Sequence, residues 1–96
     1  MRSKDFAKAF GIVVRNHRKA KGITQESLAE KADLAPKMVS LIERFQRNPT
    51  INVAHSIAEG LSVPLWRLVK DADDIRRKGR NRQEAALNKP KGGTQK

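Results

Sequence analysis

Apolar residues near the start of the chain recur at the spacing of one helical face. Five side chains between residues 5 and 21 follow the order i, i+4, i+7, i+8 and i+11, which places them on one side of a helix. Gly22 comes directly afterwards and suits the left-handed position at which many helices end. The pattern therefore predicts a helix over about residues 5–21. Its inward face consists of Phe6, Phe10, Val13, Val14 and His17.

Two short helices are predicted between residues 24 and 44. The hydroxyl of Thr24 can cap the first, over residues 25–32, by accepting a hydrogen bond from a free backbone N–H. Pro36 suits the first position of the second, over about residues 36–44, since proline lacks only an N–H that would be unpaired there. The residues expected to face inward are Leu28, Ala29, Ala32, Val39 and Ile42.

Two further helices are predicted after a turn at residues 45–49, where Asn48-Pro49 disfavours helix. Thr50 can cap a helix over about residues 51–60, and Pro64 opens a fifth helix. Inward positions are assigned to Ile51, Ala54, Ile57, Ala58, Leu61, Leu65 and Leu68. Trp66 and Val69 could also lie in the core, and the candidates for an interface between subunits are Leu65, Trp66 and Val69. The fold class is all-α, a globule of five short helices.

Ninety-six residues leave room for one domain with a tail. The chain has 21 Lys and Arg against 10 Asp and Glu, a net charge of +11, of which +6 lies in residues 1–69 and +5 in residues 70–96. After Ile75 the one sizeable apolar side chain is Leu87, too little for a core. We therefore expect a domain over residues 1–70 and a basic tail over residues 71–96, disordered or partly helical. The excess charge calls for a polyanion, a membrane or an acidic protein as partner.

Several function classes are disfavoured. Cysteine is absent, so the chain forms no disulfide or thiolate metal site, and no apolar run is long enough to span a membrane. His17 and His55 lie on separate predicted helices without partners at metal-ligand spacing, and no glycine-rich phosphate loop or nucleophile motif occurs. We expect a cytoplasmic protein that is not an enzyme and has no metal or cofactor.

The segment GITQESLAEKADLAPKMVSLIER at residues 22–44, continued by QRNPTI at 46–51 and IAEGLSV at 57–63, carries a resemblance. It closely resembles the lambda-repressor-like, Cro-type helix-turn-helix domains of bacterial and phage regulators, over about residues 10–69. The resemblance implies a compact five-helix DNA-binding domain that acts as a transcriptional regulator. It implies a homodimer on a (pseudo)palindromic double-stranded DNA operator, with the helix over residues 36–44 in the major groove.

The resemblance also assigns roles to single residues. It implies an ion pair between Arg18 and Glu43, which match the arginine of the first helix and the glutamate near the end of the third. Candidates for contact with base edges are Pro36, Lys37, Met38, Ser40 and Leu41, of which Lys37 can donate to guanine and Met38 has packing as an alternative. Candidates for contact with DNA phosphates are Gln25, Arg44, Arg47 and Asn48.

Four residues depart from the family pattern. Pro36 replaces a polar residue that often reads bases, and Ala35 replaces a frequent Ser or Thr cap. Phe45 stands where glycine often ends the third helix, and because a bulky residue resists positive φ, a different turn geometry is expected there. Ser62 likewise replaces a frequent glycine.

The tail has three open interpretations. Its cations could form an arm on DNA phosphates or the minor groove, it could bind a partner protein as in an antitoxin-like module of this fold, or it could be a solubilising end or a short extension of the fifth helix. The cations of the possible arm are Arg76, Arg77, Lys78, Arg80 and Arg82.

Overall fold

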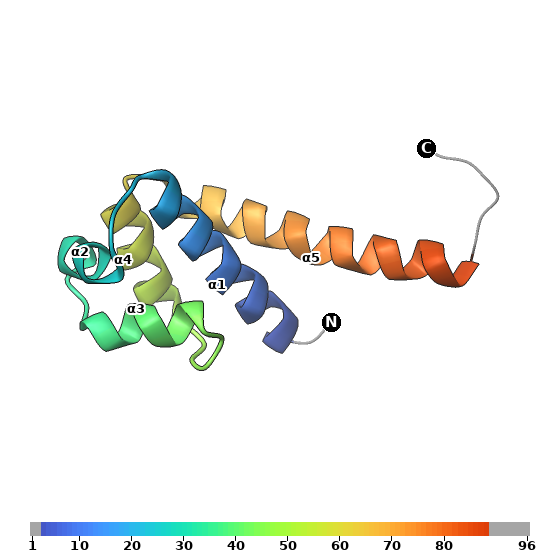
Figure 1. Ribbon diagram of the computed structural model, residues 1–96, viewed down its shortest axis with the longest axis horizontal. Coiled ribbons are helices and arrows are strands. Elements are labelled where there is room, and N and C mark those ends of the chain that lie inside the picture. Colours follow the sequence, from blue (N-terminus) through green and yellow to red (C-terminus); the bar gives the residue numbers. More distant parts are fainter. Residues whose placement is uncertain (1–2, 89–96) are drawn as a thin grey trace.

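Five α-helices account for the regular structure of the computed structural model, which describes residues 3–88, and the side chains of residues 6–78 (Figure 1). Their bounds are α1 Ser3–Ala20, α2 Gln25–Ala32, α3 Pro36–Glu43, α4 Ile51–Leu61 and α5 Leu65–Asn88. No strand occurs within the described residues. The all-α class is confirmed, and the first four helices begin and end within two residues of the predicted bounds.

The helices enclose one core. α1 packs along the first part of α5 and against α3, while α2 packs against α3 and α4 (Figure 1). The largest side chains that are wholly enclosed come from all five helices: Leu28, Ile42, Ile57, Leu61, Leu68, Val13, Val14 and Val39. Since each helix contributes a stripe at helical spacing, no helix can bury its apolar face without its neighbours.

Both predicted threonine caps are present. Thr24 Oγ1 accepts a hydrogen bond from the Ser27 amide at 2.9 Å, and Thr50 Oγ1 accepts one from the Val53 amide at 3.1 Å. Ala35 precedes α3 without a side-chain cap, and Pro36 occupies the start of that helix. Pro36 has no N–H to satisfy, and the Met38 amide donates to Ala35 O at 2.9 Å, so the first turn of α3 forms without a side-chain cap.

Each of the first four helices is followed by a residue with positive φ. Gly22 adopts φ 70°, but Asp33, Phe45 and Ser62 adopt φ 59°, 64° and 61° without being glycine. The expectation of a different turn geometry at Phe45 is therefore wrong. The Gln46 amide donates to Leu41 O at 2.8 Å, and the Phe45 ring faces Lys8 Nζ, 5.7 Å from the ring centroid, so local hydrogen bonds and packing offset the backbone cost of about 1–2 kcal/mol.

The packed core continues a few residues past position 70, where the sequence places the end of the domain. α5 continues without interruption from Leu65 to Asn88, and Ala72 is completely buried in the core, with Ile75 packed against it. The packed part of the domain thus extends beyond residue 70, and the later residues project from it as a helix (Figure 1). Regular i, i+4 ion pairs along α5, Lys70 with Asp74 among them, explain why so polar a stretch is helical.

Four large apolar side chains are exposed, those of Phe45, Ile51, Trp66 and Val69. Ile51, for which the sequence predicts an inward position, is 72% exposed. It is the first residue of α4, at the solvent-exposed end of that helix. Trp66, for which core and interface were both open, is 64% exposed. Both side chains therefore present apolar surface to solvent.

Gly11 supplies the close contact between α1 and α3. A Cβ atom at this position would lie 2.5 Å from Ile42 O and 3.1 Å from the Phe45 ring. We expect Gly11→Ala to lower the free energy of unfolding by about 1–3 kcal/mol, although alanine is the better helix former, because the helices must move apart. Chemical denaturation measures the change.

The control for Gly11→Ala is Asn16→Ala, at an exposed position of the same helix. This substitution is expected to leave stability unchanged or to raise it by a few tenths of a kcal/mol. Equal stability of the two variants would contradict the close-packing role of Gly11.

Candidate nucleic-acid interface

α3 has one buried side and one open side. Val39, Ile42 and Glu43 are buried, whereas Pro36 and Lys37 are exposed. Ser40 lies three residues after Lys37 and is half-buried, so the two side chains share the open side. Polar donors on the surface of a short, accessible helix are the groups that base edges in a DNA groove can accept.

The start of α2 lies beside this open side of α3. A hollow of about 560 Å³ separates the first turns of the two helices. Its lining combines two cations, one carboxylate, three neutral polar side chains and one proline: Arg18, Lys37, Glu26, Thr24, Gln25, Ser40 and Pro36. Two helix N-termini with free or capped N–H groups favour negative charge in this hollow.

A buried carboxylate fixes the relation of α3 to its neighbours. Arg18 Nε donates to Glu43 Oε2 at 2.8 Å, and Arg18 Nη2 donates to Glu43 Oε1 at 3.0 Å. Arg18 Nη1 also donates to Ile23 O at 2.8 Å, so the same guanidinium holds the turn between α1 and α2. The pair that the resemblance implies is thus a two-pronged ion pair, with side chains 11% and 3% exposed. Its hydrogen bonds to Glu43 raise the pKa of Arg18.

Gln25 is the third member of this group. Its Nε2 donates to Glu43 Oε1 at 3.0 Å, which ties the first residue of α2 to the last residue of α3. A phosphate that approaches the start of α2 would therefore meet a side chain already held in one orientation. The sequence resemblance gave Gln25 a DNA contact but not this structural bond.

The other sequence-predicted phosphate contacts lie on one connection. Arg44, Arg47 and Asn48 are exposed and follow α3 directly, before α4 begins. Gln25 lies at the start of α2 and is bonded to Glu43, the last residue of α3. The phosphate candidates thus come from two segments, the start of α2 and the connection that follows α3.

The apolar base-contact candidates differ from the polar ones. Met38 is half-buried and packs against the core, which is the packing alternative. Leu41 is also half-buried. Pro36 and Lys37 are the more accessible members of the set, and Lys37 is the only one of the two with a hydrogen-bond donor.

Two of the cations proposed for a DNA arm form ion pairs within α5. Arg76 Nη2 and Arg77 Nε each donate to Asp73, at 3.1 Å, and these bonds lower the pKa of that carboxyl group. Lys78 is exposed. The side chains of Arg80 and Arg82 lie outside the described residues.

His17 joins α1 to α5, a contact that the sequence did not reveal. His17 Nε2 and Asp71 Oδ2 are 2.9 Å apart, and Arg67 Nε donates to the same oxygen at 3.3 Å. The hydrogen bond to His17, supported by Arg67, lowers the pKa of Asp71. The i, i+4 spacing of Arg67 and Asp71 was a visible helical signal, but assigning Asp71 to a tail hid it.

Comparison with known proteins places these features in a family. The helix-turn-helix family model matches residues 14–65, which include α2, α3 and their connection. The chain belongs to the helix-turn-helix family of transcriptional regulators. This family is a class of DNA-binding regulators of Cro/C1 type and not an enzyme family.

Three similar proteins illustrate the relationship of this helix-turn-helix protein. It is 31% identical over 70 residues to the uncharacterized HTH-type transcriptional regulator y4dJ of Sinorhizobium fredii, covering 73% of this chain and 91% of that one. The wild-type restriction-modification controller protein C.Esp1396I is 36% identical, with a TM-score of 0.63 over 69% of this chain and 91% of the other. The clp gene regulator ClgR of Corynebacterium glutamicum, 22% identical with a TM-score of 0.77 over 85% and 87%, shares the fold.

The described residues contain neither a candidate membrane span nor a cluster of metal-binding side chains. No helix among them is both long and apolar enough to cross a bilayer. Within the same residues, no three His, Cys, Asp or Glu side chains gather as a metal site would require.

The Arg18–Glu43 pair generates a prediction for stability. We expect Glu43→Leu or Arg18→Met alone to cost about 3–5 kcal/mol, because each leaves a largely buried charge without its partner. The double variant should cost far less than the sum, and chemical denaturation of all four proteins measures this coupling.

The matched control is the exposed pair Lys70–Asp74 on α5, whose side chains are 61% and 45% exposed. Its coupling in a Lys70→Met, Asp74→Leu cycle should stay below about 1 kcal/mol. Additive effects of the Arg18 and Glu43 substitutions would show that the pair does not act as a unit.

The His17–Asp71 contact generates a pH prediction. Because the folded protein lowers the pKa of Asp71, the contact stabilises the fold above the ordinary aspartate pKa of about 3.9 and loses that effect as pH falls. Asp71→Asn should therefore lower stability by about 0.5–1 kcal/mol at pH 6, with the difference shrinking below pH ~4. Thermal unfolding across this pH range measures it.

Glu59→Gln provides the comparison for Asp71→Asn. Glu59 also faces a histidine, His55, but at 3.9 Å and with both side chains more than half exposed. Its substitution should change stability less at every pH. A pH-independent loss in Asp71→Asn would mean that the carboxylate charge is not what stabilises the contact.

Proposed function

We propose that this regulator binds a (pseudo)palindromic DNA site as a homodimer, with α3 of each copy in the major groove. The observation that carries the proposal is the open side of α3, where exposed Lys37 and half-buried Ser40 border the hollow at the start of α2. Membership of the helix-turn-helix family supports DNA as the partner.

Lys37 is the base-reading residue in this proposal. Its ammonium group can donate to guanine O6 and N7, and no acidic partner holds it within the described part of the chain. Ser40 stands one helical turn further and can donate or accept. Pro36 brings a rigid apolar surface to the start of the helix, and Leu41 supplies apolar contact for a thymine methyl.

Phosphate contacts from two segments next to α3 would set its position in the groove. Gln25 supplies one at the start of α2, and Arg44, Arg47 and Asn48 supply others on the connection after α3. The bond from Gln25 to Glu43 keeps the first contact at a constant place relative to α3. Such contacts fix register and make affinity depend on salt, while adding little sequence discrimination.

A homodimer follows from the size of the reading element. α3 has 8 residues and is about 12 Å long, so it spans only a few base pairs. Two copies on half-sites about 10 base pairs apart would double the contacts, and a two-fold axis in the protein would require a matching axis in the DNA.

Lys37→Ala and Arg47→Ala separate the two kinds of contact. Lys37→Ala should cost about 1–3 kcal/mol on the preferred site and relax preference at one base step, since a base donor is lost. Arg47→Ala should weaken binding to preferred and random DNA alike and flatten the salt dependence. Titration at several salt concentrations measures both, after the preferred site has been selected from a random DNA pool.

The control for this pair is Lys31→Ala, an exposed cation near the end of α2 rather than beside α3. It should leave the ratio of preferred to random affinity unchanged. Equal losses on both DNAs for Lys37→Ala and Arg47→Ala would exclude base reading by Lys37.

A further inference from the structure

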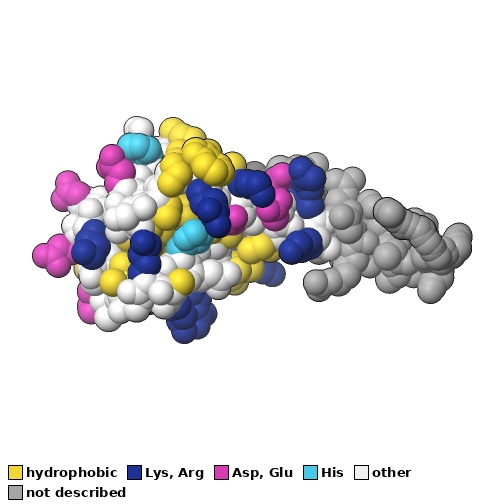
Figure 2. Space-filling model, turned by 90° about the horizontal axis from the view of Figure 1, so that it is seen from above, with side chains coloured by type: hydrophobic (Ala, Val, Ile, Leu, Met, Phe, Trp, Pro, Cys, Tyr) yellow, Lys and Arg dark blue, Asp and Glu magenta, His cyan; other side chains and the backbone are white. Residues whose placement is uncertain are grey.

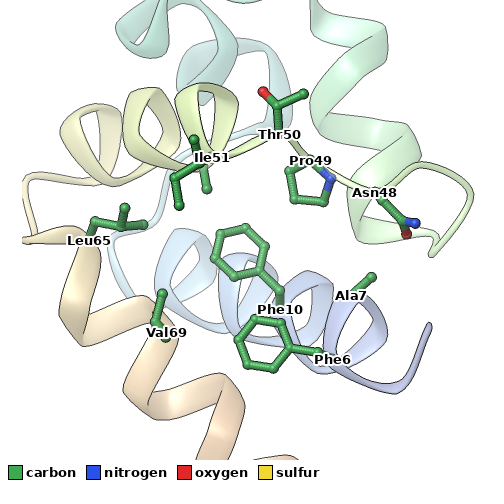
Figure 3. A pocket seen from close by; sticks show the side chains of 10 residues that line it. Phe6, Ala7, Phe10, Asn48, Pro49, Thr50, Ile51, Leu65 and Val69 are labelled. Carbon is green, nitrogen blue, oxygen red and sulfur yellow. The ribbon is translucent and has the colours of Figure 1, made fainter. Parts of the chain in front are cut away.

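The second turn of α1 lies against the connection that follows α3. Lys8 Nζ stands 5.7 Å from the centre of the Phe45 ring, and Phe45 directly follows Arg44, the residue that caps the end of α3. In addition, Ala7 and Asn48 line one apolar hollow of about 370 Å³, and Figure 3 shows both at the same end of it. Two separate contacts therefore bring the start of α1 to this connection.

The Phe45 ring is held in place by α1. A Cβ atom at Gly11 would lie 3.1 Å from the ring, so the edge of the ring lies directly on the α1 backbone. Gly11 comes three residues after Lys8 and is its neighbour on the helix surface. The ring is 48% exposed, and its face attracts the Lys8 ammonium group through a cation–π interaction. Lys8 thus has a preferred position, which an isolated surface lysine lacks.

The surroundings of Lys8 are basic. Residues 44–50 include Arg44 and Arg47 and no acidic residue, and both arginines are exposed, as is Lys8. The carboxylate just before this segment, that of Glu43, is buried and already paired with Arg18. Cations of like sign repel one another, and an anion bound between them relieves that repulsion. The start of α1 and the connection after α3 together therefore favour an anionic partner.

The cations of α5 have different surroundings. Acidic side chains lie among the basic ones along the first part of that helix (Figure 2). Arg67, Lys70 and Arg77 each pair with an aspartate four residues away. By contrast, none of the ion pairs between described side chains includes Lys8 or an arginine of the connection after α3. The surface beside α3 is therefore the better site for a polyanion.

We propose that Lys8 is a further DNA contact and that it binds a backbone phosphate next to those bound by Arg44 and Arg47. The inference rests on the proposed function and adds a residue of α1 to its phosphate-binding surface. Because an ammonium group binds phosphate as a point charge, what Lys8 needs is a fixed position, which the Phe45 ring supplies. Lys8 precedes residues 14–65, the segment that the family model matches, so the contact comes from outside that segment.

The salt dependence of DNA binding measures this contact. The experiment titrates two labelled duplexes with the full chain, one carrying the preferred site and one of random sequence, and follows fluorescence anisotropy over a series of salt concentrations. Each phosphate contact adds about 0.9 to the slope of log affinity against log salt concentration, which is roughly an eightfold gain in affinity for a tenfold fall in salt. Chemical denaturation checks that every variant is folded.

Three variants test the charge of Lys8. Lys8→Met removes the charge and keeps an apolar stem over the ring, so it should weaken binding to both duplexes by about fivefold to tenfold per bound copy at ~0.1 M salt and lower the slope by about 1. Lys8→Arg keeps the charge and the contact with the ring, and should bind as the unmodified chain does. Lys31→Met, an exposed position in the last turn of α2, removes the same charge and should leave the slope unchanged.

Phe45→Gly tests the role of the ring. Glycine accepts the φ of 64° at this position, so the turn is retained while the ring is lost. Binding should weaken by about twofold to fivefold, because the DNA alone must then order the Lys8 side chain. In a Lys8→Met background the same substitution should leave affinity unchanged, whereas a purely structural role of the ring would give equal losses in both backgrounds.

Four outcomes separate this inference from the proposed function. A lower slope for Lys8→Met, with Lys8→Arg and Lys31→Met unchanged, supports it. Equal slopes for Lys8→Met and Lys31→Met overturn it and leave the proposed function standing. Equal losses for Phe45→Gly in both backgrounds overturn the positioning of Lys8 by the ring. An unmodified chain that binds neither duplex overturns the proposed function and this inference together.

Discussion

A single buried carboxylate fixes how α1, α2 and α3 are arranged. Glu43 accepts hydrogen bonds from two nitrogens of Arg18 and from Gln25, so its oxygens join α1, the start of α2 and the end of α3. Burying a charge is costly unless it is fully paired. Any other placement of α1, α2 and α3 that broke these bonds would leave the Glu43 carboxylate buried without a partner and would destabilise the fold. The ion pair therefore acts less as a source of stability than as a constraint on how α2 and α3 can sit. Everything proposed for the hollow between them depends on that constraint.

The early part of the fold was readable from the sequence because its signals are local. Threonine hydroxyls at residues 24 and 50 cap the helices they precede, and the apolar spacing of α1 identifies its buried face. The Arg18–Glu43 pair could be named through family resemblance, although the two residues are 25 positions apart. Local hydrogen bonding and periodicity are properties of short segments, so they survive without knowledge of the tertiary structure.

The sequence was less informative where contacts between residues far apart in the chain determine the local structure. Phe45 adopts φ 64° because its ring packs beside Gly11 and Lys8, which no local rule can anticipate. Residues after 70 looked too polar to belong to a domain, yet Asp71 meets His17 and Ala72 enters the core. Likewise, the sequence offers Gln25 as a phosphate contact or as a helix former near the cap, because its bond to Glu43 exists only once α3 is in place. At the site, residue type could suggest a DNA contact, but it could not reveal which side chains the fold already holds.

Because α5 is one continuous helix, the charged residues that it carries lie along a single axis. A helix of 24 residues is about 36 Å long and nearly straight, so it behaves as a rod rather than as a coil. In Figure 1 the rod leads away from α3, and its ion pairs draw cations such as Arg77 onto Asp73. Among the described residues, two separate groups of exposed cations therefore lie beside α3 and along α5. A flexible segment could fold back onto α1–α4, whereas one continuous helix extends away from them.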